Sequence, residues 1–474
     1  MSQIDVTAPR QWDLWALLPV VAGLYWLLGD SSSGWLWWGL LPACLMLSTG
    51  MGLLLWPGDS RLPQFLAAGG LIGTLFALPG IFVGGFWDAL VVAALSSGSF
   101  LVAGATAMRA LPGAKGMPAP RQDWQSYAKI ALDDALLAYF RGTAVLPSGD
   151  QAHGACDEVV RALQISAEQG WAKQPQQLHN APGVPSRQSV TQRRVYGRDY
   201  EHLQFRSEFV ADPGIPGAAR WTGFHGNDQC HAWVLRHSGR PRPWLMGIHG
   251  YRMGVPWLDF SLFDPRWLHD RMGFNLILPV LPLHGLRRHG WRSGDSYLDG
   301  EFMDVFHAQT QALWDLRRTL AWLRQQEDQP QIGVMGFSLG GYNAALLAQY
   351  EEALDFVIAG IPLTDVASAL WANIPQAHQG YYEARGVGEA QLRQMLQPVS
   401  PLARKPLQDK DRRFIFAGNL DRLIPPPEVM KLAAHWEVEP RWFHGAHLTF
   451  RGAKAVSSSV SDAAAAAGWP AASS

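Results

Sequence analysis

The clearest candidate for covalent chemistry in this sequence is a serine between glycines. The segment 336–340 (GFSLG) fits the pattern G-x-S-x-G around Ser338, directly after the apolar run 332–335 and before the helix-like residues 342–350. On a sharp strand-to-helix turn the serine hydroxyl is exposed, and a Cβ at either glycine would collide with the neighbouring chain. A serine hydroxyl is a poor nucleophile near neutral pH, so it needs a base that a carboxylate orients.

A carboxylate and an imidazole follow Ser338 in the order that such a site needs. Asp421 comes after the apolar run 414–417, and His447 comes after the short run 442–444. Both residues would lie in loops at the carboxyl ends of strands. We expect Asp421 to orient His447, and His447 to take the proton of Ser338.

Each of these two roles has a rival nearby. Asp365 follows the apolar run 356–361 and could supply the carboxylate instead of Asp421. His444 lies within the short expected strand, which suits packing or the surface better than proton transfer. We favour Asp421 over Asp365, and His447 over His444.

The elements that must position these residues alternate between strand and helix from about residue 193 onward. Short, continuously apolar runs are typical of strands buried on both faces of a parallel sheet. Such runs cover residues 244–248, 274–280, 332–336, 356–361 and 414–417. Apolar residues at helical spacing predict a long amphipathic helix over 306–323. The alternation predicts a doubly wound α/β domain, in which catalytic groups lie at the carboxyl ends of the strands.

The order of the candidate residues is that of a known superfamily. The serine turn, Asp421 and His447 occur in the order Ser, Asp, His, and in this residues 193–450 resemble the α/β-hydrolase superfamily. The resemblance implies an α/β-hydrolase fold, a mostly parallel sheet flanked by helices, with a helical cap insertion at about 363–407. It also implies that acyl-chain specificity resides in this cap.

The resemblance further assigns roles to the loop after the first apolar run. His249 and the glycine after it match the superfamily's oxyanion loop. An oxyanion hole formed by the backbone N–H groups of Tyr251 and Leu339 is implied, aimed at the charge that develops on the attacked carbonyl. His249 is a candidate substrate-binding residue, although a histidine here commonly shapes the turn instead. Tyr251, Arg252 and Trp257 could line the pocket, although Trp257 could equally anchor this loop in the core.

Two arginines after the second apolar run would open onto the same face. Arg287 and Arg288 are candidate substrate-binding residues because a guanidinium can pair with an anionic group of the substrate. Two other interpretations stay open. The arginines could belong to a solvated loop, or they could contact lipid headgroups near a bilayer.

The first 110 residues differ in chemistry from the rest of the chain. Four stretches carry no charged residue: 14–29, 35–56, 62–87 and 89–108. Each approaches or exceeds the roughly 20 residues that cross a hydrocarbon core. Tryptophans cluster near their ends, which is typical of an interfacial belt. We predict about four transmembrane helices in residues 1–110, rather than a buried helical bundle of a soluble protein.

The charges between these stretches predict an orientation. With four spans, one side carries all the basic residues of this region and its exit, Arg10, Arg61, Arg109, Lys115 and Arg121. The positive-inside rule then places the catalytic domain in the cytoplasm. The excess of arginine over lysine, common in G- and C-rich genomes, favours a bacterial inner membrane. If residues 62–108 were one span plus a re-entrant segment, the domain would lie outside.

The remaining chain divides by composition. We predict that residues 111–190 form a Pro- and Gly-rich linker followed by amphipathic helices. These helices could lie on the membrane or pack on the next domain. Residues 191–452 are the predicted catalytic domain. The Ala- and Ser-rich residues 453–474 predict a low-complexity tail that is frayed or disordered.

The overall composition argues against several classes of partner. The 39 Lys+Arg residues are balanced by 40 Asp+Glu, a formal net charge of -1, which disfavours a nucleic-acid partner. Three cysteines without CxxC or Cys/His spacing indicate neither a disulfide scaffold nor a zinc site. No motif requires a metal or another cofactor. The oligomeric state does not follow from the sequence.

These features predict a membrane-anchored serine hydrolase that cleaves carboxylic esters, of lipase or carboxylesterase type, through a Ser-His-Asp triad and an acyl-enzyme. The expected partners are an ester or lipid substrate and the bilayer. The same triad could serve an acyltransferase or a peptidase. The scaffold could also belong to a catalytically inactive membrane interaction protein.

Overall fold

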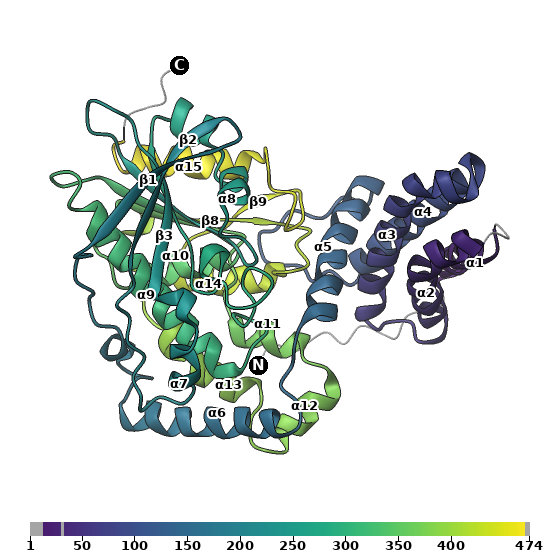
Figure 1. Ribbon diagram of the computed structural model, residues 1–474, viewed down its shortest axis with the longest axis horizontal. Coiled ribbons are helices and arrows are strands. Elements are labelled where there is room, and N and C mark those ends of the chain that lie inside the picture. Colours follow the sequence, from purple (N-terminus) through teal and green to yellow (C-terminus); the bar gives the residue numbers. More distant parts are fainter. Residues whose placement is uncertain (1–12, 30–32, 470–474) are drawn as a thin grey trace. The chain divides into compact units, whose positions relative to one another are not determined.

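The structure contains a nine-stranded sheet with the order β1-β2-β3-β5-β4-β6-β7-β8-β9. Some of its strands are labelled in Figure 1. The structure, a computed structural model, describes residues 13–29 and 33–469. Strands β5, β4, β6, β7 and β8 are parallel, whereas β1, β2 and β3 join the β5 edge as antiparallel neighbours. The strands are β1 (Gln188–Val195), β2 (Arg198–Arg206), β3 (Gln229–Leu235), β4 (Trp244–Ile248), β5 (Asn275–Pro279), β6 (Ile332–Phe337), β7 (Phe356–Gly360), β8 (Arg413–Gly418) and β9 (Arg441–Phe443).

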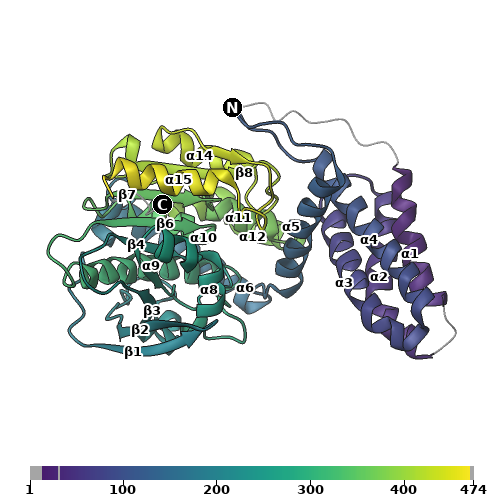
Figure 2. The same cartoon turned by 90° about the horizontal axis from the view of Figure 1, so that it is seen from above.

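The central strands are buried along their whole length. Every residue of β4, β5, β6 and β7 is buried, so both faces of this part of the sheet are covered. Continuous apolar runs of Val, Ile, Leu and Met satisfy this requirement, because both sets of alternating side chains meet protein. Helices that include α10 (Leu339–Leu347) and α15 (Lys454–Ala466) pack on these strands (Figure 2). The predicted mostly parallel sheet flanked by helices is confirmed.

Helices fill most of the connections between the strands. The long amphipathic helix predicted over 306–323 is α9 (Phe302–Leu323), whose capping box is formed by Glu301 and Asp304. The insertion between β7 and β8 is helical, as expected of a cap, and contains α11 (Val366–Asn373), α12 (Gln376–Glu383) and α13 (Glu389–Leu396). The other helices here are α6 (Asp150–Glu168), α7 (Ala218–Thr222), α8 (Pro256–Leu262) and α14 (Pro426–Trp436).

The chain forms two compact units, which do not coincide with the predicted boundaries. The helical unit comprises Met1–Ala144, Gly418–Pro427 and Trp442–Arg451. The sheet unit comprises Val145–Ala417, Glu428–Arg441 and Gly452–Ser474. The predicted connector, residues 111–190, is therefore divided. Its first helix, α5 (Trp124–Thr143), packs on helices of the N-terminal region, whereas α6 packs on α9 and α13.

The N-terminal region is a bundle of apolar helices. They are α1 (Leu17–Leu28), α2 (Ser33–Leu55), α3 (Arg61–Gly84) and α4 (Phe86–Arg109). Small residues allow them to approach closely, since a Cβ on Gly70 of α3 would lie 2.7 Å from the backbone nitrogen of Phe100 on α4. Helices α3 and α4 are separate and of 24 residues each, with Gly85 between them at φ 90°. Each of the two helices is long enough to form a span of its own, as the count of four spans assumes.

Three of these helices could cross a membrane by length and composition: Gly34–Leu55, Arg61–Gly84 and Phe86–Arg109. The fourth predicted span is a shorter apolar helix, Leu14–Leu28, in the described part of the chain. The 12 residues of α1 rise only about 18 Å, whereas a hydrocarbon core is about 30 Å thick. The count of four spans, and the cytoplasmic placement that depends on it, stay predictions.

The prediction of a frayed or disordered C-terminal tail is wrong for the residues described there. Residues Lys454–Ala466 form α15, and the indole nitrogen of Trp469 beyond it donates a hydrogen bond of 2.9 Å to Asp355. Alanine is the strongest helix former, and Val456, Val460 and Ala463 place a buried stripe on one face of the helix. The low complexity of this segment concealed a helical pattern. Residues 470–474 lie outside the described part.

Candidate functional site

Ser338 stands on the strand-to-helix turn that its flanking glycines predict. It directly follows β6 and is the N-cap of α10, with φ 57° and ψ -117°. Its backbone nitrogen donates to the carbonyl of Gly360 at 2.9 Å, and its carbonyl accepts from Tyr342 and Leu363, both at 3.1 Å. A positive φ at a residue with a Cβ is strained, and these bonds to α10 and to the β7 end hold it in place.

The two glycines around Ser338 have no room for a side chain. A Cβ on Gly336 would lie 2.0 Å from the carbonyl oxygen of Gly340. A Cβ on Gly340 would lie 1.9 Å from the carbonyl oxygen of Ile248, at the end of β4. Both distances are far below van der Waals contact, so the tight turn requires glycine at each position.

His249 shapes the loop beside the serine and does not fit the substrate-binding role proposed for it. Its Nε2 accepts a hydrogen bond from the backbone nitrogen of Leu281 at 3.1 Å, so Nδ1 carries the proton and donates to the carbonyl of Gly250 at 2.8 Å. The ring is buried, and burial lowers its pKa. The loop passes the nucleophile, because a Cβ on Gly250 would lie 3.6 Å from Cβ of Ser338.

The two predicted oxyanion donors come from different segments. Leu339 follows Ser338 directly, and Tyr251 lies in the loop after β4. Leu339 is the first residue of α10, where a backbone N–H has no acceptor within its own helix. Tyr251 follows Gly250, and the guanidinium of Arg252 lies 4.6 Å from its ring centre. Trp257 is 51% exposed, so it does not anchor this loop in the core. The oxyanion role of Tyr251 and Leu339 stays a prediction.

Arg252, expected to line the pocket, instead ties the oxyanion loop to residues 293–299. Arg252 has φ 68°, pairs with Asp295, and donates to Asp299 at 2.7 Å and to the carbonyl of Ser293 at 3.1 Å. The hydroxyl of Ser293 in turn donates to the carbonyl of Met253. The acidic residues at 295 and 299 have no fixed spacing to Arg252, so no local sequence pattern predicts this pairing.

Arg287 is buried and does not fit the substrate-binding role predicted for it. Its side chain is fully buried, and it donates to Asp315 at 2.6 Å, to the carbonyl of Val280 at 2.8 Å and to that of Asn227 at 3.1 Å. A guanidinium engaged in a buried ion pair is not presented to a ligand. Arg288 is exposed, and its candidate role is unaffected.

Asp421 and His447, the predicted acid and base, are in direct contact. In the helical unit, Oδ2 of Asp421 lies 2.7 Å from Nδ1 of His447, and both side chains are buried. The other oxygen of Asp421 accepts from the backbone nitrogen of Ile424 at 2.8 Å. Burial alone would lower the pKa of His447, but the charge and hydrogen bond of Asp421, with the charge of Asp133, outweigh burial and raise it.

The two rivals are engaged elsewhere. Asp365 caps α11 through the backbone nitrogen of Ser368 at 3.1 Å and pairs with Arg393 at 2.9 Å and Lys431 at 3.4 Å. His444 is half-buried, and its Nε2 lies 3.0 Å from the hydroxyl of Ser126. In the part of the chain that the structure describes, neither residue is hydrogen-bonded to Asp421 or His447.

A third buried carboxylate, Asp133 on α5, lies beside this pair and was missed in the sequence. It accepts hydrogen bonds from the backbone nitrogens of His447 at 2.8 Å, Arg422 at 3.1 Å and Leu448 at 3.2 Å. Burial first, and then the charge of Asp421, raise the pKa of Asp133 to about 7. The available signal was an acidic residue within the apolar face of an amphipathic helix.

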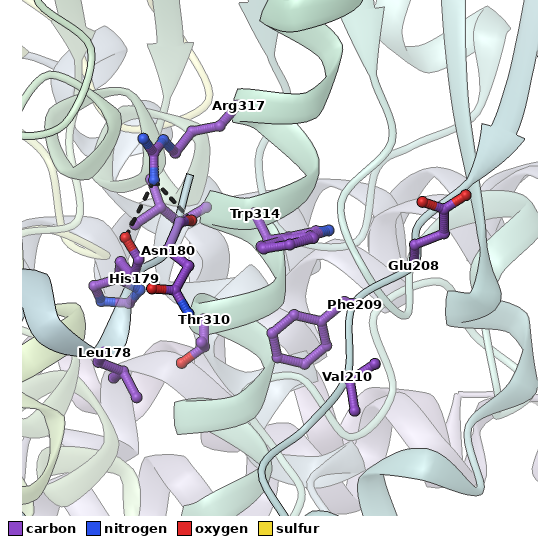
Figure 3. Close-up of a pocket in the computed structure, with 10 residues that line it drawn as sticks. Leu178, His179, Asn180, Glu208, Phe209, Val210, Thr310, Trp314 and Arg317 are labelled. Atoms are coloured by element: carbon purple, nitrogen blue, oxygen red, sulfur yellow. Dashed lines mark hydrogen bonds between the residues drawn. The ribbon is translucent and has the colours of Figure 1, made fainter. Parts of the chain in front are cut away.

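A pocket of about 240 Å³ lies elsewhere in the sheet unit (Figure 3). Its lining includes His179, Phe209 and Trp314, and none of the candidate catalytic residues. Arg317 at its wall donates to the carbonyls of His179 and Asn180 at 3.3 and 3.0 Å. In residues 13–29 and 33–469, no group of three or more His, Cys, Asp or Glu side chains could hold a metal ion.

The chain is similar to proteins of known sequence. The uncharacterized proteins MT2702 and Rv2627c of Mycobacterium tuberculosis are each 36% identical to it over 295 residues, which is 62% of this chain and 70% of the relative. Residues 302–442, which include Ser338 and Asp421, match the prolyl oligopeptidase family, Peptidase_S9.

Solved structures of hydrolases are also similar, at low identity. Acetyl xylan esterase 1 from Thermoanaerobacterium is 16% identical, with a TM-score of 0.39 over 66% of this chain and 94% of the esterase. The acylaminoacyl peptidase of Pyrococcus horikoshii is 14% identical, with a TM-score of 0.36 over 54% of this chain and 38% of the peptidase. By its fold and its family matches, the chain belongs with the two mycobacterial relatives to one family of the α/β-hydrolase superfamily.

Proposed function

We propose that the protein is a membrane-anchored serine hydrolase in which Ser338, His447 and Asp421 act as a catalytic triad. The buried hydrogen bond between Asp421 and His447 is the observation that carries this proposal. It is supported by the sheet, since β6 and β8 are both parallel neighbours of β7 and end at the same edge. Ser338 follows the end of β6, and the chain leads from β8 into the loop of Asp421.

In the proposed reaction, Oγ of Ser338 attacks the carbonyl carbon of an ester while Nε2 of His447 takes the hydroxyl proton. Asp421 keeps Nδ1 protonated and stabilises the imidazolium that forms. The oxyanion is bound by the backbone N–H groups of Tyr251 and Leu339. His447 then protonates the departing alkoxide, which leaves an acyl-serine. Water, deprotonated by His447, releases the acid and restores the serine.

We assign carboxylic esters, including lipid esters, as the substrate class, because the apolar helices α2, α3 and α4 would hold the enzyme where such substrates concentrate. The match to the prolyl oligopeptidase family favours a peptidase as the second candidate. The same triad would then cleave an amide and protonate an amine leaving group.

Active-site labelling tests the proposal. The full chain in detergent is treated with a fluorophosphonate probe, and the labelled residue is mapped by mass spectrometry. Labelling at Ser338 that disappears in Ser338→Ala and falls strongly in His447→Ala is expected. Folded wild-type protein that resists the probe would contradict the triad and favour an interaction protein on a hydrolase scaffold. Parallel assays with short-chain esters, long-chain esters and peptide amides then separate the two substrate classes.

The membrane placement is tested separately. We propose that the catalytic domain faces the cytoplasm of a bacterial cell, from the basic residues that flank the apolar helices. A reporter that is active only outside the cytoplasm, fused directly after Met108, should be silent. An active reporter would place the domain on the outer side and leave the triad proposal intact.

A further inference from the structure

Helix α5 brings a carboxylate into the middle of the two loops that carry the acid and the base. Asp133 accepts from the backbone nitrogen of Arg422, next to Asp421, and from those of His447 and Leu448. The loop of Asp421 and the loop of His447 are thus bonded to one side chain. All three amides point at the same carboxylate, which leaves that group no exposed surface.

Apolar packing places α5 in this position. Ile130 of α5 is buried in one cluster with Ala107 and Met108 of α4 and with Leu420 and Ala446 of the two loops. Helix α4 approaches α5 so closely that a Cβ on Gly104 would lie 1.9 Å from the carbonyl oxygen of Tyr127. The membrane-competent helix α4, the helix α5 and the two loops therefore form one packed body.

The charges around His447 come from two elements. Asp421 faces His447 from the loop after β8, and Asp133 faces it from α5. Beside them Asp134 receives a hydrogen bond of 3.1 Å from the Arg422 side chain, and Arg141 lies near that pair. Two buried carboxylates around one imidazole stabilise its protonated form, the form that arises when it takes a proton from the serine.

Burying a group that can carry a charge is costly, so a neutral side chain is ordinarily the more stable choice at a buried position. Only a carboxylate offers acceptor sites on two oxygens for three N–H groups, without a donor of its own in the ionised form. Its use therefore points to the geometry and charge of the base.

We infer that Asp133 is a positioning residue, which locks the loops of Asp421 and His447 together from α5 and so makes the N-terminal helices part of the catalytic machinery. The inference rests on the proposed function of His447 as the base. It assigns to the N-terminal region a role beyond anchorage, since α5 and α4 form the support of the acid–base pair.

The test uses the full chain in detergent and measures the rate of fluorophosphonate labelling at Ser338 against pH. In Asp133→Asn, one amide nitrogen must face an N–H donor, so the loops shift. We expect the maximal rate to fall roughly 10- to 100-fold, as for a base displaced by a fraction of an ångström to about 1 Å. Loss of the negative charge should also move the acidic midpoint of the rate profile down by about 0.5 to 1 pH unit.

Asp134→Asn is the matched control. It removes a neighbouring buried carboxylate on the same helix, but one whose partner is the Arg422 side chain and not His447. This variant should lose thermal stability without a shift of the pH midpoint. Equal midpoints in wild type, Asp133→Asn and Asp134→Asn, with rates within about twofold, would overturn the positioning role while leaving the triad intact. No labelling of wild type would overturn the triad and this inference together.

Hydrogen exchange of the wild type decides the matter if Asp133→Asn does not fold. The amides of Arg422, His447 and Leu448 should exchange slowly, as donors to a buried carboxylate do. Exchange of the peptides around them at the rate of exposed loops would show that Asp133 does not hold the loops, and would overturn the inference.

Discussion

Oδ2 of Asp421 lies 2.7 Å from Nδ1 of His447, and both side chains are buried away from water. This contact fixes which ring nitrogen carries the proton, since a carboxylate can only accept. The opposite nitrogen, Nε2, is then the one left to act as a base. The chemistry proposed for the protein depends on this assignment.

Replacing the acid should remove most of the activity without unfolding the protein. In Asp421→Asn the amide NH2 can donate to Nδ1 of His447, which leaves the proton on Nε2 and removes the base. We therefore expect the labelling rate at Ser338 to fall by about 10³- to 10⁴-fold. Asp365→Asn, the matched change at the rival acid, should leave the rate within a few-fold because Asp365 is engaged with Arg393 and Ser368. The reverse ranking would show that Asp365 is the acid.

Stability should fall as the pH rises through the range in which Asp133 titrates. Burial and then Asp421 raise the pKa of Asp133 from 3.8 to about 7. Between these values the folded state binds more protons at this site than the unfolded state, so the free energy of unfolding decreases with pH. The raised pKa of His447 acts in the same direction, since its contribution is lost as the pH rises through the folded pKa.

Thermal unfolding of the wild type and of Asp133→Asn in the same detergent, from pH 4 to pH 8, measures this effect. The variant lacks the titrating group, so its melting temperature should decline less over this range than that of the wild type. Parallel curves for the two proteins would be inconsistent with a raised pKa at Asp133.

The turn around Ser338 should not tolerate a methyl group. Gly340→Ala places a Cβ 1.9 Å from the carbonyl of Ile248, and we expect a loss of about 1 to 3 kcal/mol or more in stability together with loss of labelling. Gly380→Ala is the control, since no atom lies within 4 Å of its Cβ position, and it should be neutral or slightly stabilising. Labelling of Gly340→Ala at the wild-type rate would contradict the proposed turn.

The two neighbouring arginines should behave differently. Arg287→Ala leaves Asp315 buried without its cation, so we expect a loss of about 3 to 5 kcal/mol in the free energy of unfolding. Arg288→Ala should change stability by less than about 0.5 kcal/mol, because the side chain is exposed. A higher KM of Arg288→Ala for anionic esters, with kcat unchanged, would assign substrate binding to Arg288. An unchanged KM would remove it from the site.

The predictions that held rest on short-range chemistry. Gly336, Gly340 and the strands on either side of them are required by one turn, so a few consecutive residues are enough to predict it. The apolar runs of β4 to β7 are equally local, because a strand that is buried on both faces must be apolar at every position. The prediction of a disordered tail was wrong although it also rested on neighbouring residues. An alanine-rich composition is compatible both with disorder and with a helix, and the residues around Val456 and Val460 form a helix.

What the sequence by itself determined is the α/β architecture and the serine turn, since each is encoded in neighbouring residues. Only the tertiary structure decided how charged side chains are used. Arg287 meets Asp315 28 residues away, and Asp133 meets the His447 backbone 314 residues away. Whether such a group binds substrate, supports a loop or orients a base depends on the partner that folding delivers, and no local pattern specifies a partner at that distance.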